Sequence, residues 1–480
     1  MMDDQTQIDR KGKLSIMQMS TPETSLANAL LQRRQKLANE FATPVILWSG
    51  SPCSRNFPAN VYPFRPSSHF LYFAGVSLEN AAIRLEGGRL ELFMDDPHPG
   101  STLWHGEMPT RSQVAEAIAA DEAFPLSELK SRSQNAATVA APDLKTRMEQ
   151  VDLLDRPVGL FPDQGNPTVA RDRALALAIA QLRLIQDEWA IRELLQASAC
   201  TVQAHLVGMM STRRAQTEAM VRGAMEGAIM AQNFTCAYNS IVTVEGQVLH
   251  NQHYHNPLQP GDLLLVDVGA ETGTGWAADV TRTWPVSGQF SPTQRAIYDV
   301  VLAAHDCCIE KVGPGVEYAD IHRVAAVAIA EGLVELGILL GNPEDLVEMD
   351  AHALFFPHGV GHLLGLDVHD MEDLGDIAGY QEGRDRSDRF GLCYLRLNRT
   401  LQPGMFVTIE PGFYQVPAIL NDPQRREQYD GVVNWDKLAQ FHDVRGIRIE
   451  DDVMVTQEGR EVFTAALPVQ AQKVEQIVRG

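Results

Sequence analysis

Two aspartates stand where a carboxylate is unexpected. Residues 263–266 (LLLV) form an apolar run between Gly261 and Gly269, typical of a strand buried on both faces, and Asp267 follows that run directly. Asp279 also has mostly apolar neighbours, between WAA and VTR. A buried carboxylate without a partner costs several kcal/mol, so a cation, a metal ion or a proton must neutralise it. A strand-end aspartate can also form a turn or cap a helix, but two of them on adjacent strands indicate a metal site.

The C-terminal half supplies histidine and glutamate candidates. The segment HALFFPHGVGHLLGLDVHD (352–370) holds four histidines among glycines, which let the backbone approach a metal or substrate closely, although the H-E-x-x-H motif is absent. A predicted strand over 405–409 ends at Glu410. A later strand within 445–456 delivers Glu450, which alternation places on the same face as Arg448. Each glutamate alone could be an exposed strand-end residue, and a lone histidine could be a core or surface residue.

The set suggests a particular chemistry. Two aspartates, two glutamates and one histidine form an oxygen-rich donor set, which favours harder ions such as manganese over an all-sulfur zinc site. Four carboxylates, two divalent ions and one bridging hydroxide nearly balance in charge, so the set allows two ions. Two ions about 3.5–4 Å apart could lower the pKa of a bridging water and polarise a carbonyl oxygen. The sequence therefore predicts hydrolysis of an amide bond.

Composition excludes several other classes. The chain has 480 residues, 45% of them hydrophobic and 21% charged, as expected for a globular protein of two or three domains. A net charge of −22 argues against nucleic acid and anionic membranes as partners. We find no signal peptide and no apolar run near the ~20 residues that span a bilayer, and therefore expect a cytoplasmic protein. The six cysteines contain no C-x-x-C pair, and we interpret them as reduced and structural.

The expected elements form an α/β (α+β) protein with a small N-terminal domain and a larger catalytic domain. We expect a disordered N-terminus over 1–22, an α/β domain over 23–185 and the catalytic domain over 186–480, with Asp187 capping the helix after the boundary. Gly87 and Gly88 predict a hairpin, and Ser291, Pro292 and Gln294 predict a helix start. The other expected elements are helices at 24–39, 111–120, 133–139, 167–185, 187–210, 214–231 and 318–339, and strands at 44–48, 158–161 and 237–244.

With these residues in view, the chain resembles the pita-bread metallopeptidases, in the Xaa-Pro branch that contains aminopeptidase P and prolidase. The matching stretches are VDVGA, ADVTRT, HGVGHLLGLDVHD, QPGMFVTIEPGFY and GIRIEDDVMVT, with YPFRPSSHFLYFAGV matching the N-terminal domain of the family. The likeness covers residues from about 25 to the end. It implies a small N-terminal domain before a pita-bread catalytic domain, and two divalent ions, manganese first and cobalt or zinc as alternatives.

The resemblance also implies roles for individual residues. The implied metal ligands are Asp267, Asp279, His362, Glu410 and Glu450, with Asp279 and Glu450 bridging the two ions. Glu410 would assist proton transfer while the bridging hydroxide attacks the carbonyl carbon before proline. Further residues with an implied place in the active site are His250, His358, His369 and Arg448, with Tyr414 a weaker match.

Two substrate classes remain open. The segment YPFRPSS resembles aminopeptidase P, whereas the insert between Glu410 and Glu450 resembles prolidases, so an aminopeptidase acting on peptides with proline at the second position is expected and an Xaa-Pro dipeptidase is the alternative. A catalytically inactive peptide-binding protein and a metal-free hydrolase resembling creatinase are disfavoured, because all five ligands are present. The family is commonly dimeric or tetrameric, so the resemblance implies a homo-oligomer. Trp104 could lie at a subunit contact, or be an ordinary surface or core residue.

Overall fold

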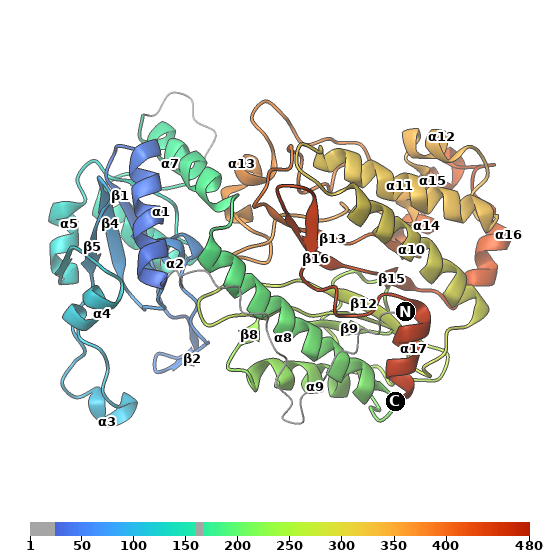
Figure 1. The fold of residues 1–480 in the computed structure, drawn as a ribbon, viewed down its shortest axis with the longest axis horizontal. Coiled ribbons are helices and arrows are strands. Elements are labelled where there is room, and N and C mark those ends of the chain that lie inside the picture. The colour runs from blue at the N-terminus through green and yellow to red at the C-terminus, as the bar shows by residue number, and fades with distance from the viewer. Residues whose placement is uncertain (1–24, 160–166) are drawn as a thin grey trace, which may run out of the picture.

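The computed structural model describes residues 25–159 and 167–480, which form two parts (Figure 1). The N-terminal part surrounds a mixed sheet of order β6-β5-β4-β1-β7. Its strands are β1 (Val45–Trp48), β4 (Ala82–Glu86), β5 (Arg89–Phe93), β6 (Glu122–Phe124) and β7 (Ala137–Thr138), with a separate hairpin of β2 (Ser54–Phe57) and β3 (Asn60–Val61). Its helices are α1 (Leu26–Glu40), α2 (Ser68–Ala74), α3 (Thr102–His105), α4 (Arg111–Ala117), α5 (Leu129–Arg132), α6 (Leu144–Leu154) and α7 (Pro167–Arg183).

Local chemistry explains most of this part. β4 and β5 form the predicted hairpin. Gly87 and Gly88 in its turn have φ values of 59° and 84°, which residues other than glycine rarely adopt. The helix predicted over 133–139 is wrong. Asn135 has a φ of 60°, which breaks the helix, and the apolar residues after it pair with β1 as the parallel strand β7. The strand predicted over 158–161 is not formed at 158–159, and residues 160–161, like 1–22, lie outside the described residues.

The C-terminal part places small antiparallel sheets among helices. The sheets have orders β12-β10-β9, β13-β16-β17, β14-β15 and β11-β8. The strands are β8 (Thr235–Cys236), β9 (Ile241–Thr243), β10 (Leu263–Asp267), β11 (Ala270–Glu271), β12 (Thr281–Pro285), β13 (Phe406–Ile409), β14 (Gly412–Tyr414), β15 (Gly446–Arg448), β16 (Asp451–Val455) and β17 (Arg460–Val462). The helices are α8 (Glu188–Thr212), α9 (Glu218–Met230), α10 (Pro292–Lys311), α11 (Tyr318–Glu335), α12 (Pro343–Glu348), α13 (Asp376–Gly379), α14 (Pro417–Leu420), α15 (Pro423–Gln428), α16 (Trp435–Leu438) and α17 (Ala471–Arg479).

Two predicted details of this part can be compared with the structure. Ser291 and Gln294 form the predicted capping box of α10, because each side chain accepts a hydrogen bond from the backbone N–H of the other. The single strand predicted to deliver Glu450 is instead two strands, β15 and β16. β15 pairs with β14 and β16 pairs with β13, so Glu450 lies where the chain changes partner.

Buried ion pairs join the two parts. Arg33 on α1 binds Asp187 through two nitrogens at 2.7 and 3.1 Å, and Asp187 also accepts the N–H of Ala190, which confirms its predicted role as the cap of α8. Arg183 at the end of α7 binds Asp367 and Asp370 of the catalytic part. These contacts fix α7 and α8 at the junction of the two parts (Figure 1). The exact domain boundaries stay a prediction.

Two expectations about the whole chain bear on its environment. Within 25–159 and 167–480, no helix has the length and apolar character needed to cross a membrane. All six cysteines are unpaired, and Cys53 and Cys307 are exposed, so the structural role expected for every cysteine is wrong for these two. The cytoplasmic location stays a prediction.

Candidate metal centre and active site

The two aspartates lie side by side because their strands are neighbours. Asp267 is the last residue of β10 and pairs with Thr281, the first residue of β12, and Asp279 lies just before β12. Both side chains are buried, as predicted. The Tyr238 hydroxyl lies 2.5 Å from Asp267 Oδ1 and 2.6 Å from Asp279 Oδ1. Tyr238 was missed from the sequence, where it occupies a stretch predicted to be a plain strand.

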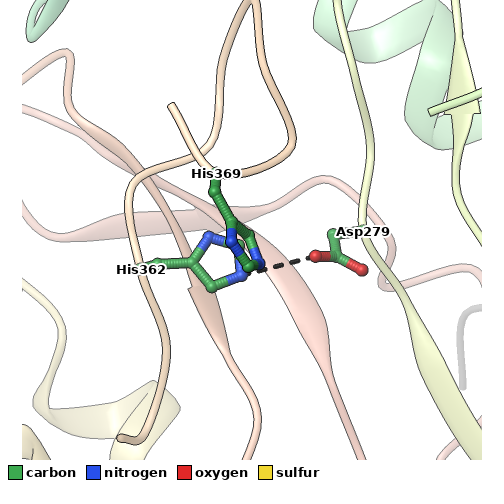
Figure 2. A group of neighbouring side chains, drawn as sticks. All are labelled: Asp279, His362 and His369. Atoms are coloured by element: carbon green, nitrogen blue, oxygen red, sulfur yellow. Dashed lines mark ion pairs between the residues drawn. The ribbon is translucent and has the colours of Figure 1, made fainter. Parts of the chain in front are cut away.

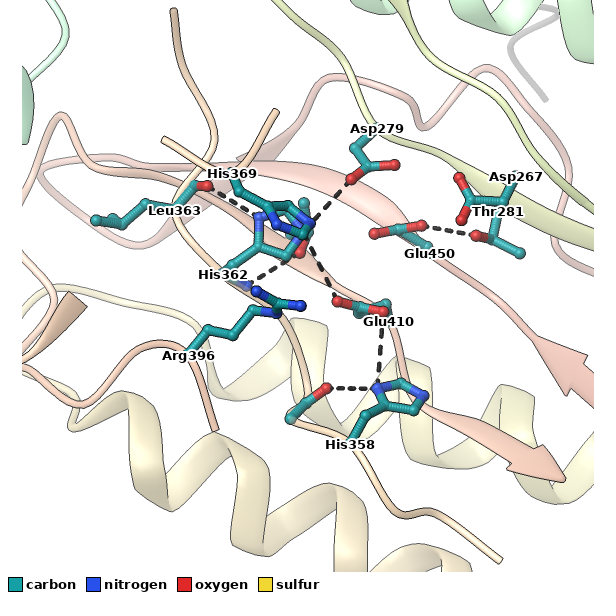
Figure 3. Close-up of polar contacts among 12 residues, drawn as sticks. Asp267, Asp279, Thr281, His358, His362, Leu363, His369, Arg396, Glu410 and Glu450 are labelled. Atoms are coloured by element: carbon teal, nitrogen blue, oxygen red, sulfur yellow. Dashed lines mark hydrogen bonds and ion pairs between the residues drawn. The ribbon is translucent and has the colours of Figure 1, made fainter. Parts of the chain in front are cut away.

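All five ligand candidates converge on one place. Figure 3 shows the carboxylates of Asp267, Asp279, Glu410 and Glu450 turned toward one space, with His362 beside them. Three overlapping triads have their ligand atoms within 4.8 Å of one another; they are Asp279, His362 and His369; His362, Glu410 and Glu450; and Asp267, Asp279 and Glu450. Residues up to 183 positions apart in the chain therefore form one cluster.

The histidine is oriented as a ligand would be. His362 Nδ1 lies 2.9 Å from the backbone carbonyl of Leu363, which accepts a hydrogen bond from that nitrogen and leaves Nε2 for other contacts. Nε2 faces Asp279 Oδ2 at 3.4 Å and Glu410 Oε1 at 3.8 Å. The His369 ring lies against it at a tilt of 58°, with ring centroids 4.3 Å apart, and both rings lie beside Asp279 (Figure 2).

The electrostatics of the cluster call for positive charge. Burial, reinforced by neighbouring carboxylates, raises the pKa of Glu450 well above its usual range and that of Asp267 to about 6. Burial also raises the pKa of Glu410 to about 8. Burial pushes the pKa of Asp279 up as well, but the hydrogen bond with His362 holds it below its usual value. Three buried acidic groups and the partly buried Glu410, with one or two imidazoles, fit divalent cations, which neutralise the repulsion and prefer oxygen donors.

A hydrogen-bonded frame supports the carboxylates. Arg448 Nη2 donates to Asp267 Oδ2 at 2.6 Å, Nη1 to the Tyr414 hydroxyl at 2.9 Å, and Nε to Thr281 Oγ1 at 2.9 Å. The Thr281 hydroxyl in turn donates to Glu450 at 2.7 Å. Arg448 thus orients Asp267 directly and Glu450 through Thr281.

A histidine and a tyrosine form a second polar group. His358 Nε2 lies 2.9 Å from the Tyr414 hydroxyl, and His358 Nδ1 lies 3.8 Å from Glu410. Burial lowers the pKa of His358 to about 3, so its ring is neutral at pH 7 and can donate or accept a hydrogen bond. Burial raises the pKa of Tyr414 to about 12, which keeps its hydroxyl protonated.

The cluster forms the floor of a cavity of about 630 Å³. His250 and His369 line it together with the five ligand candidates, His358 and Arg448, so every predicted site residue except Tyr414 borders this cavity. Gly359, one of the glycines expected to let the backbone approach a metal or substrate, also lines the cavity. Sequence reasoning missed the other lining residues, which lie in polar or irregular stretches without a recognisable pattern: Leu249, Pro357, Arg386, Tyr394, Arg396, Val416 and Ile419.

The fold and the buried cluster define a metallopeptidase of the pita-bread class. Residues 192–457 match the model of metallopeptidase family M24, and residues 30–142 match the N-terminal domain of aminopeptidase P. The chain therefore belongs to metallopeptidase family M24.

Relatives and solved structures extend the likeness to both parts. A probable Xaa-Pro aminopeptidase of Talaromyces marneffei is 31% identical over 87% of this chain and 88% of its own length. The structure of Pseudomonas aeruginosa aminopeptidase PepP superposes with a TM-score of 0.77 at 26% identity, over 94% of this chain and 98% of that one. A zinc-substituted Escherichia coli aminopeptidase P in complex with product gives a TM-score of 0.75 at 26% identity, with the same coverage.

Proposed function

We propose that the chain is a metal-dependent exopeptidase that hydrolyses the Xaa-Pro bond at the N-terminus of peptides. The observation that carries this proposal is the convergence of Asp267, Asp279, His362, Glu410 and Glu450 on the floor of one cavity. The substrate class comes from the similar proteins, which are named Xaa-Pro aminopeptidases.

The five converging residues are the proposed ligands of two divalent ions. Asp279, His362 and Glu450 each belong to two of the three triads, and of these only the two carboxylates have two oxygen atoms to offer, which supports a bridging role for Asp279 and Glu450. Manganese is the first candidate and cobalt or zinc the alternatives, since the donors are mostly carboxylate oxygens. Two such ions would supply a hydroxide nucleophile at neutral pH and polarise the carbonyl before proline.

The residues of the chain supply the proton transfers. Glu410 borders both the ligand cluster and the open cavity, so its carboxylate takes the remaining proton of the hydroxide as it attacks and passes that proton to the leaving proline nitrogen. The nitrogen must receive this proton because it can leave as a neutral amine but not as an amide anion. His250 lines the same cavity, where it can donate a hydrogen bond to the oxyanion. The neutral His358 also lines it, and its two ring nitrogens bond the Gly359 carbonyl and the Tyr414 hydroxyl, so it positions Tyr414 and the adjacent backbone. Arg448 and Tyr414 form the hydrogen bonds that keep the carboxylates in position.

Apolar side chains complete the cavity. Leu249, Val416 and Ile419 line it beside the polar groups and offer a surface for the proline ring or the first side chain. Val416 and Ile419 belong to the insert whose sequence resembles prolidases, which folds as α14, α15 and α16. This insert supports Xaa-Pro dipeptidase as the second candidate, whereas the names of the similar proteins favour the aminopeptidase.

A pair of matched substitutions tests the proposal. Glu410→Gln keeps the shape of the side chain and removes its capacity to take a proton, and it should lower kcat at least about 100-fold on a peptide that begins Ala-Pro. Glu461→Gln, on the exposed face of β17, makes the same chemical change away from the cavity and should leave kcat unchanged. Equal activity of the two variants would contradict the assigned role of Glu410. The homo-oligomeric state, dimer or tetramer, stays a prediction that sedimentation can test.

A further inference from the structure

A second cavity, the interdomain groove, lies where the two parts of the chain meet. Its volume is about 590 Å³, within the range of about 300–1,000 Å³ that ligand sites occupy. One wall is built by N-terminal residues 49–53, 62–68 and 142–143, and the other by residues 367–369 with Ala237, Glu271 and Asp373. No role in the proposed chemistry uses this groove.

The groove and the catalytic cavity share one lining residue. His369 borders both cavities, and its ring lies tilted by 58° against that of His362 at the candidate metal centre, with ring centroids 4.3 Å apart. An exopeptidase that cleaves before proline at the second position has a single residue on the amino side of the cut. The part of a longer substrate that extends beyond the catalytic cavity is therefore the chain after proline.

We propose that the interdomain groove binds the residues that follow proline in a peptide substrate, and that it selects basic side chains there. This inference rests on the proposed Xaa-Pro exopeptidase function and names the class of peptide that the enzyme prefers.

The apolar lining suits an extended peptide. Tyr62, Pro63, Phe64, Pro66 and Pro142 line the N-terminal wall, and Tyr62 keeps 50% of its surface exposed. Aromatic and proline side chains lose little conformational entropy when a ligand packs on them, so they bind extended chains efficiently.

The charges of the groove set its preference. Four carboxylates line it, and they belong to Asp143, Glu271, Asp367 and Asp373. Two guanidinium groups face these acids: Arg65 pairs with Glu271 and Asp367, and Arg183 pairs with Asp367.

The remaining acids leave the balance negative. Asp373 contacts the His69 ring at 2.9 Å, and Asp143 caps α6 by accepting the N–H of Thr146, without an ion pair among the residues that the structure describes. Burial raises the pKa of Glu271 to about 7, so this acid carries part of a charge at pH 7; the four acids still outweigh the two arginines and leave the groove negative, in a chain whose net charge is −22. Lysine or arginine side chains of a peptide are attracted, and acidic ones are repelled.

The floor of the groove is formed before any ligand binds. Arg65 donates to Glu271 at 2.7 Å and to the carbonyl of Leu366 at 2.6 Å, and Ser68 donates to Asp367 at 2.5 Å. These contacts tie the N-terminal wall to the segment that carries His369. A fixed groove binds without an added ordering cost, so a charge preference shows directly in kcat/KM.

The test compares peptides that differ only after proline. Ala-Pro-Lys-Lys and Ala-Pro-Glu-Glu should differ by about tenfold in kcat/KM at low ionic strength, with the lysine peptide the better substrate and Ala-Pro-Ala-Ala between them. The ratio should shrink when salt is raised to about 0.5 M, because screening weakens the attraction. Equal rates for the lysine and glutamate peptides would overturn the inference while leaving the Xaa-Pro function intact. Cleavage of none of the peptides would overturn the function and the inference together.

Two exposed cysteines provide a matched pair of variants. Cys53 lines the groove, and Cys307 lies on α10 away from it. Cys53→Lys adds a positive charge to the groove and should lower the lysine-to-glutamate ratio about threefold, whereas Cys307→Lys should leave it unchanged. Equal ratios in the two variants would place the preference outside the groove.

A second pair tests the aromatic wall. Tyr62→Ala should raise KM for Ala-Pro-Ala-Ala at least about threefold, and Phe57→Ala, which removes an aromatic residue of 55% exposure that does not line the groove, should not. An unchanged KM in Tyr62→Ala would remove the wall from the proposed site.

Discussion

Arg183 offers the sharpest test of how the two parts of the chain are held together. It lies at the end of α7 with a side-chain exposure of 1%, and its Nη2 donates to Asp370 at 2.6 Å and to Asp367 at 2.9 Å. Its Nη1 lies 3.1 Å from Nδ1 of His69, which is also buried. The segment it holds contains His369 of the catalytic cavity.

Replacing Arg183 by methionine keeps the approximate volume and leaves the Asp370 carboxylate buried without its cation. Breaking one side of a buried ion pair costs about 3–5 kcal/mol, because the remaining charge is neither solvated nor paired. We therefore expect the free energy of unfolding to fall by this amount in urea, followed by tryptophan fluorescence. Arg183→Lys keeps the charge and loses the forked geometry, so its loss should lie between that of the methionine variant and zero.

Two controls separate the ion pair from packing. Arg295→Met removes one member of a helix-surface pair with Asp299, whose side chains are 39% and 49% exposed, and should cost no more than about 0.5 kcal/mol. Adding Asp370→Asn to the Arg183→Met variant removes the unpaired charge and should recover at least about 1 kcal/mol. A loss below about 1 kcal/mol in Arg183→Met, or no recovery in the double variant, would refute the reasoning.

Three further predictions address other parts of the structure, and thermal or urea unfolding at controlled pH measures each. Burial would raise the pKa of Asp187, but hydrogen bonds from Arg33 hold it below its usual value, so the pair stabilises the fold above about pH 4 and this stabilisation is lost as pH falls through the lowered pKa. The difference in unfolding free energy between wild type and Asp187→Asn should be about 2 kcal/mol at pH 7 and vanish near pH 2. A difference that does not change with pH would contradict this. Chelators should lower the melting temperature and manganese should restore it. Glu450→Gln should raise the melting temperature of metal-free protein by about 2 °C, because it removes a buried acid whose pKa is raised well above its usual range and which must therefore take up a proton on folding; a lowered melting temperature would argue against this. The same variant should lose peptidase activity, because it lacks a proposed metal ligand. Gly361→Ala should lower the free energy of unfolding by at least about 2 kcal/mol, because the φ of Gly361 is 155° and an added Cβ would collide with a backbone carbonyl. The Cβ added by Gly223→Ala on α9 meets no atom within 4 Å, so this variant should be more stable by up to about 1 kcal/mol. Similar effects at both positions would contradict the steric argument.

The sequence was most informative where a residue type conflicts with its surroundings. Asp267 and Asp279 could be singled out because a carboxylate in apolar company needs compensation, and the structure brings both to one buried cluster. Elements with strong local signals, such as the capping box at Ser291 and the hairpin at Gly87 and Gly88, were also predictable.

Features that depend on tertiary context were not predictable. The stretch over 133–139 has helical spacing, yet pairing with β1 makes part of it a strand. Tyr238 bonds both aspartates only because β10 and the chain before β12 meet beside it. The interdomain groove is lined by residues within 49–68 and within 367–373, and no pattern along the chain predicts that these segments lie together.

The most direct test of the central claim is cleavage of Arg-Pro-Pro-Gly-Phe by metal-stripped protein before and after manganese is added. The proposed function predicts no arginine release from the stripped protein and release of free arginine once manganese is present. Cleavage confined to the dipeptide Ala-Pro would make the enzyme a dipeptidase instead. Full arginine release without metal, or none with manganese, cobalt or zinc, would contradict a metal-dependent Xaa-Pro aminopeptidase.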